Sequence, residues 1–84
     1  MIVAEVTVDV YATFEGKPYR VYIDTTLMTE RTFRWPLEEN YVEEHMIVQV
    51  EEGQSHTVSI TPDAGFILKN VRVNGVPSNE TFII

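Results

Sequence analysis

Residues 2–14 read Ile-Val-Ala-Glu-Val-Thr-Val-Asp-Val-Tyr-Ala-Thr-Phe, and this stretch decides the fold class. Every even position is apolar, while most odd positions carry polar or charged side chains. A period of two is typical of a β-strand that turns one face to a core and the other to water. The stretch therefore predicts one long strand whose inward face carries Ile2, Ala4, Val6, Val8, Val10, Ala12 and Phe14.

Turn signals divide the rest of the chain into short strands. Glu15-Gly16-Lys17-Pro18 predicts a reversal, so that residues 2–14 and 19–25 form a first hairpin. Residues 41–50 and 56–61, on either side of the polar segment 51–55, are predicted to form a second hairpin. Further strands are predicted at 66–73 and 81–84, and Asn74-Gly75 is a strong signal for a type I′ turn.

About seven short strands predict a small antiparallel β-sandwich, immunoglobulin-like in plan, as a single domain over residues 1–84. Val, Ile and Thr make up a third of the chain, which favours strands over helices. Residues 26–40 leave two possibilities open, because 32–35 reads as a strand whereas Pro36 suits the start of a helical turn. A helix over 36–45 would instead indicate a β-grasp-like α+β fold.

The overall charge excludes several kinds of partner. Thirteen acidic and six basic side chains give a net charge of -7, which repels nucleic acid and anionic membranes. No apolar run approaches the roughly 18 residues of a spanning helix, so we expect no membrane insertion. Residues 1–6 alternate and do not resemble a signal peptide, which leaves the localisation open. Asn79-Glu80-Thr81 matches a glycosylation acceptor, relevant only in a secretory pathway.

Candidate catalytic and metal-binding groups are few. His45 lies among acidic side chains that could bind a metal ion, at Glu38, Glu39, Glu43 and Glu44. Neighbours on a strand point to opposite faces, so we interpret the cluster as a solvated acidic edge and predict no metal or cofactor. Ser55 and His56 cannot face one another on a strand either, and the acidic side chains mostly fall on the polar side of the alternation. The chain is therefore predicted not to be an enzyme.

Aromatic side chains supply a candidate interaction surface. Tyr11 and Tyr22 fall on the nominally polar faces of their strands and could meet as a cross-strand pair, with Trp35 as a third candidate. Exposed aromatic side chains are typical of protein and carbohydrate recognition. The alternative is that these faces are covered and Trp35 is part of the core.

Residues 56–76 contain a strand, a Pro-x-x-Gly-aromatic turn and a Val-x-Val-Asn-Gly ending, at Val58, Ile60, Pro62, Gly65, Phe66, Val71, Val73, Asn74 and Gly75. In these features the segment resembles the bacterial extracellular repeats related to the internalin B-repeat. The resemblance implies a β-rich surface or adhesion module without catalytic residues.

These observations lead to two functional hypotheses. The first is a non-catalytic binding or adhesion-type accessory module that recognises a protein or a glycan. The alternative is a structural subunit of a larger assembly such as a viral or phage particle, for which a homo-oligomer is one form. Ile83 and Ile84 suggest this alternative, because exposed apolar residues mark interfaces.

Overall fold

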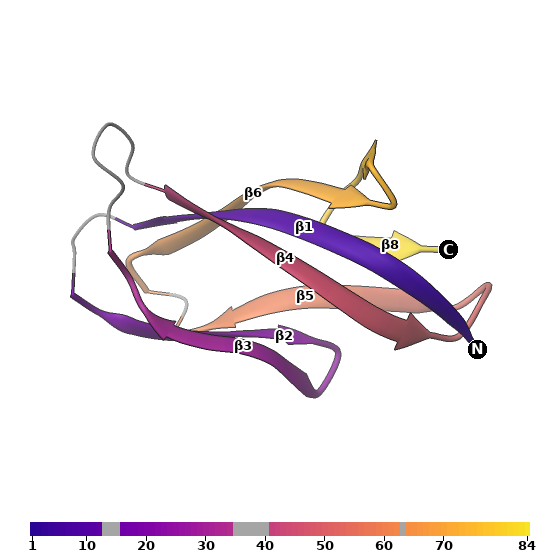
Figure 1. Cartoon of the computed structure of the whole chain (residues 1–84), viewed down its shortest axis with the longest axis horizontal. Helices are drawn as coiled ribbons and strands as arrows, with labels where there is room; N and C mark the ends of the chain where they lie inside the picture. The colour runs from indigo at the N-terminus through magenta and orange to yellow at the C-terminus, as the bar shows by residue number, and fades with distance from the viewer. Residues whose placement is uncertain (13–15, 35–40, 63) are drawn as a thin grey trace.

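A computed structural model describes residues 1–12, 16–34, 41–62 and 64–84 (Figure 1). This part of the chain contains eight strands and no helix, arranged as two four-stranded antiparallel sheets that pack as a β-sandwich. The strands are β1 (Ile2–Ala12), β2 (Pro18–Ile23), β3 (Thr26–Thr32), β4 (Tyr41–Val50), β5 (Ser55–Thr61), β6 (Phe66–Val73), β7 (Val76–Pro77) and β8 (Thr81–Ile83).

Sheet A has the strand order β4-β1-β6-β7, with the long β1 near its centre. β1 pairs along nearly its whole length with β4, from Ile2 opposite Val50 to Tyr11 opposite Tyr41. The even-numbered face of β1 is buried as its alternation predicts, and the described positions from 4 to 12 are at most 4% exposed. The prediction for this strand is confirmed, with Phe14 outside the described residues.

Sheet B has the order β3-β2-β5-β8. β2 and β3 form a hairpin around Asp24-Thr25, and β5 pairs with β2 on one side and with β8 on the other. Asp24 adopts a positive φ of 56°, which an aspartate tolerates better than most residues. This hairpin was not predicted, since residues 19–25 were expected to be strand throughout.

Both hairpins predicted at residues 2–25 and 41–61 are wrong. β1 and β2 lie in different sheets, and so do β4 and β5, so each connection crosses the sandwich. Glycine and proline signal that the chain changes direction, but they do not specify which strand becomes the neighbour. The prediction at Asn74-Gly75 is confirmed, because β6 and β7 pair around this turn and both residues have positive φ.

Three aromatic rings join the two sheets in the core. The ring of Tyr19 on β2 lies 5.4 Å from that of Phe66 on β6, and Phe33 lies 6.2 Å from each of them. Phe33 is fully buried, and the valines of β1 complete the same apolar cluster. The contacts among these rings therefore join residues that lie far apart in the sequence.

The described residues contain no α+β arrangement. Residues 41–45, for which a helix was one alternative, belong to β4, whereas residues 36–40 lie outside the described part. Within the described ranges we find no helix with the length and apolarity needed to cross a membrane.

Candidate functional site

On one side of the sandwich, two strand edges lack a partner along part of their length. The first of these edges belongs to β5. β8 pairs only with residues 55–57 of β5, and the Val58 N–H donates to the Glu80 carbonyl oxygen over 2.8 Å. Beyond this point, residues 59–61 have no partner strand on the side away from β2, within the described structure. β5 thus presents a short open edge.

The edge of β6 on the same side is also open. β7 pairs only with Arg72 and Val73, so residues 67–70 have no described strand beside them on the side away from β1. Between the two edges lies a hollow of about 410 Å³. We call it the slot; its lining residues are Thr57, Val58, Ser59, Ile60, Phe66, Ile67, Leu68 and Glu80.

The slot combines backbone hydrogen-bonding groups with apolar side chains. Donors on a strand alternate between its two sides, so the Ile60 N–H and carbonyl face the same side as the Val58 N–H, toward the slot. Ile60 and Leu68 are half-buried, and Ile67 is 53% exposed. An extended segment could satisfy this edge and place alternate apolar side chains between the sheets.

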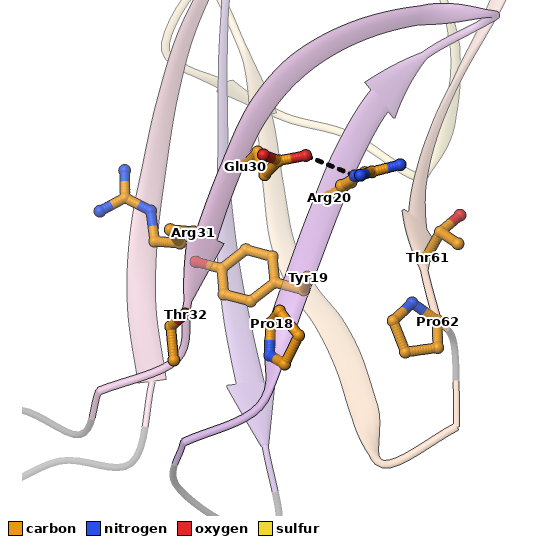
Figure 2. A pocket seen from close by; sticks show the side chains of 8 residues that line it. All are labelled: Pro18, Tyr19, Arg20, Glu30, Arg31, Thr32, Thr61 and Pro62. Atoms are coloured by element: carbon orange, nitrogen blue, oxygen red, sulfur yellow. Dashed lines mark hydrogen bonds and ion pairs between the residues drawn. The ribbon is translucent and has the colours of Figure 1, made fainter.

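A second hollow, of about 480 Å³, lies beside β2 and β3 (Figure 2). Figure 2 shows Arg20 and Glu30 in contact across one face, with Thr61 and Pro62 on the opposite rim. Their Nε and Oε2 atoms lie 2.5 Å apart, and Arg31 is likewise paired with a carboxylate, that of Glu44. Both arginine charges are therefore compensated, and nothing in this hollow favours a particular ligand.

Glu44 is a buried carboxylate, so its assignment to a solvated acidic edge is wrong. It is 2% exposed, accepts a hydrogen bond from the Tyr19 hydroxyl at 2.9 Å, and is paired with Arg31, whose Nη2 donates over 3.2 Å. Burial, followed by the hydrogen bond to Glu44, raises the pKa of Tyr19 well above its ordinary value. Glu44 shares its strand face with Met46 and Val50, so the alternation of β4 held the signal.

His45 lies on the opposite face of β4 from Glu44, as predicted for strand neighbours. Its Nε2 is 3.2 Å from a carboxylate oxygen of Glu5, and both side chains are half exposed or more. Glu43 contacts Arg72, while Glu38 and Glu39 lie outside the described residues. Among the residues that the structure describes, no group of three or more histidine and carboxylate side chains could hold a metal ion.

The predicted contact between Tyr11 and Tyr22 is wrong, because β1 and β2 belong to different sheets. Tyr11 instead stacks on Tyr41 across β1 and β4, with ring centroids 4.9 Å apart. The Lys69 ammonium lies over the Tyr11 ring at 4.9 Å from its centroid, which covers part of this aromatic surface. Tyr22 is half-buried in sheet B, and Trp35 lies outside the described residues.

The two C-terminal isoleucines have different surroundings. Ile83 on β8 is 69% exposed, as an interface residue would be in an isolated chain. Ile84 packs against the core, and its carbonyl oxygen accepts a hydrogen bond from the Gly53 N–H at 2.7 Å. Of the two isoleucines, Ile83 is the more exposed and the better placed for contact with another molecule.

His56 is a buried polar group that joins several segments. Its Nδ1 lies 2.7 Å from Asp24 Oδ2 and its Nε2 lies 3.0 Å from the Glu51 carbonyl oxygen. The hydrogen bond to Asp24, and then that to Glu51, raise the pKa of His56. The same contact with His56 lowers the pKa of Asp24. Ser55 is exposed on the other face of β5, so the two do not form a nucleophile and base pair.

Comparison with known proteins gives no relative of this chain. No protein-family model matches the sequence. Neither the curated proteins nor the solved structures show a significant match. The resemblance of residues 56–76 to extracellular repeats stays a prediction.

Proposed function

We propose that this chain is a non-catalytic protein-binding module that takes up an extended segment of its partner in the slot. One observation carries the proposal: in the described part of the chain, the strand edges at residues 59–61 and 67–70 have no partner strand on the same side, with a mainly apolar hollow between them. Exposed edges of this kind bind peptides by strand addition, in which backbone hydrogen bonds give affinity and alternate side chains give specificity.

The lining of the slot favours a protein segment over a glycan. Recognition of a sugar requires polar side chains directed at its hydroxyls, and the slot is lined by three polar residues, Thr57, Ser59 and Glu80. Apolar residues form the larger part of the lining, at Val58, Ile60, Phe66, Ile67 and Leu68. The partner segment is therefore extended, with an apolar residue at every second position. Because the chain has a net charge of -7 and Glu80 lines the slot, neutral or basic flanking residues fit best.

We also propose that the sandwich is immunoglobulin-like in the broad sense. Two antiparallel sheets with repeated crossings between them support this assignment. The order differs from an immunoglobulin domain in that β1 lies between β4 and β6 and is not next to β2.

A structural subunit is the second candidate, favoured by Ile83. This side chain is 69% exposed on β8, at the outer edge of sheet B, where a second copy could pair. Light scattering across a dilution series separates the two functions. A constant mass near 9.7 kDa supports the binding module, and a defined multiple supports the subunit.

The binding proposal is tested with a synthetic heptapeptide of alternating valine and threonine, carrying lysine at both ends, and a control peptide with glutamate at both ends. Amide chemical shifts of the ¹⁵N-labelled chain report the contact. We expect the basic peptide to shift residues 58–61 and 67–70, and the acidic peptide to bind more weakly.

Two variants of the chain complete this test. Ile67→Lys places a charge at the outer rim of the slot, where Ile67 lies opposite Tyr11 on the outward face of sheet A. Ile47→Lys makes the same change at a 61% exposed position on β4 away from the slot. Covering the exposed half of one isoleucine contributes about 1 kcal/mol, so Ile67→Lys weakens binding about fivefold to tenfold. Equal effects of the two substitutions, or no shifts at the slot with millimolar peptide, would contradict the proposal.

A further inference from the structure

Glu80 is the one ionisable residue among those that line the slot. Its backbone is fixed, because its carbonyl oxygen accepts the hydrogen bond from the Val58 N–H. Its side chain is exposed, and none of the ion pairs within the described ranges includes its carboxylate. The slot thus carries a negative charge that no described cation compensates. Such a charge beside apolar side chains favours a cationic group in the occupant.

The chain closes the slot at the end where Glu80 lies. Residues 78–80 connect β7 in sheet A to β8 in sheet B, so they cross from one sheet edge to the other (Figure 1). Both ends of this crossing are hydrogen-bonded, because the Ser78 N–H donates to the Val71 carbonyl oxygen over 2.7 Å and the Glu80 carbonyl accepts from Val58 over 2.8 Å. An extended segment in the slot therefore cannot run straight past Glu80. It must either turn away from the sandwich or end there.

The directions of the two edges decide which end of a segment lies at Glu80. β5 and β6 run in opposite directions on the two sides of the slot (Figure 1), and β6 runs from Phe66 toward the crossing. A segment antiparallel to β6 therefore places its N-terminal end at Glu80, whereas the reverse orientation places its C-terminal end there. At neutral pH a chain carries an ammonium at its N-terminus and a carboxylate at its C-terminus. The Glu80 carboxylate attracts the first and repels the second.

We propose that the slot selects a free N-terminus of the partner, with the terminal α-ammonium beside the Glu80 carboxylate. The first residues of the partner then run antiparallel to residues 67–70 of β6, and no preceding chain meets the crossing at residues 78–80. Alternate apolar side chains of the segment enter between Ile60 and Leu68. Capture of a terminal amine is a known mode of peptide recognition. This inference rests on the proposed function and names the chemistry of the partner segment.

The test compares two peptides that differ only at the N-terminus. Both have the sequence Val-Thr-Val-Thr-Val-Thr-Ser with an amidated C-terminus; one has a free α-amine and the other is acetylated. Titrations of the ¹⁵N-labelled chain at about pH 6.5, where the α-amine is protonated, give the two Kd values. We expect the free amine to bind about twofold to fivefold more tightly, which is the range for an exposed ion pair. Equal Kd values overturn the inference but leave the proposed function standing, whereas no shifts at the slot with either peptide contradict the proposed function itself.

Two variants show whether Glu80 is responsible for the preference. Glu80→Gln removes the charge and keeps the shape of the side chain, so the two peptides should bind this variant equally. Glu52→Gln is the matched control, because Glu52 is exposed between β4 and β5, does not line the slot and makes the same change in net charge. The preference for the free amine should persist in this control. An equal loss of preference in both variants would show an effect of overall charge and overturn the inference.

The orientation of the segment is measured with a nitroxide spin label. The label is attached to a cysteine that replaces the C-terminal serine of the free-amine peptide. We expect it to broaden the amide signals of Thr61 and Phe66, at the far end of the slot, more than those of residues 80–82. Stronger broadening at residues 80–82 would show the reverse orientation and overturn the inference.

Discussion

Replacement of Arg31 by methionine tests the ion pair that compensates the buried carboxylate of Glu44. Methionine replaces the apolar stem of the arginine side chain, although it is shorter, and removes the positive charge from Glu44. Glu44 is 2% exposed, and among the described residues it would keep the hydrogen bond from the Tyr19 hydroxyl. A carboxylate left in the core without its cation is poorly solvated, so the folded state loses stability.

The loss in the free energy of unfolding depends on how far the Arg31 side chain is exposed to water. Breaking a buried ion pair by removing one partner costs about 3 to 5 kcal/mol. The Arg31 side chain is 49% exposed, so water already screens part of the attraction, and the lower value of about 3 kcal/mol applies. A domain of this size loses about 4 to 8 °C in Tm per kcal/mol, which gives a decrease of roughly 12 to 24 °C.

Urea unfolding at pH 7, followed by circular dichroism, measures the free energy directly. Arg20→Met is the matched control, because Arg20 and Glu30 are an ion pair with both side chains more than half exposed, where water screens the attraction and its loss should change stability little. The double variant Arg31→Met/Glu44→Met leaves no buried charge and should be more stable than Arg31→Met alone. Equal losses for Arg31→Met and Arg20→Met would refute the reasoning.

Two further substitutions probe the core and a turn. Phe33→Ala removes a fully buried ring between Tyr19 and Phe66 and should lower the free energy of unfolding by about 3 to 5 kcal/mol; a loss below 1 kcal/mol would show that the site collapses around the gap. Gly75→Ala should cost about 1 kcal/mol through its φ of 80° alone, since a Cβ there meets no atom within 4 Å, and Gly75→Asn should cost less. Thermal melts of the three proteins check both expectations.

Local sequence patterns predicted where the strands lie better than they predicted which strands pair with one another. The alternation of residues 2–14 correctly assigned the buried face of β1, and Asn74-Gly75 correctly located a two-residue turn. Both features depend on side chains within a few positions of each other. Which sheet a strand joins depends instead on how apolar faces distant in sequence pack together. The turn signals before β2 and β5 therefore do not indicate that the chain crosses between the sheets at these points.

Buried polar side chains are also difficult to predict from local sequence patterns. Acidic residues were expected on the polar side of the alternation, yet Glu44 and Asp9 are buried. Glu44 could have been found, since it shares the inward face of β4 with Met46. Asp9 lies beside an irregularity in the pairing of β1 with β6, where Asn70 and Arg72 donate to its carboxylate. No spacing within β1 indicates these partners. The slot could not be predicted from the sequence either, because it arises where β7 and β8 are too short to cover the strands beside them.

The position of β1 at the centre of sheet A also governs how the chain must fold. Its two neighbours are encoded much later, since Val6 pairs with Met46 on one side and with Val73 on the other, 67 residues further along. Sandwiches dominated by such distant pairings fold over milliseconds to seconds. During synthesis at about 5 to 20 residues per second, β1 would wait roughly 3 to 13 s for its second neighbour. Over that interval the edge of β1 that later pairs with β6 has no partner strand, so its backbone hydrogen-bonding groups stay open to pairing with other chains.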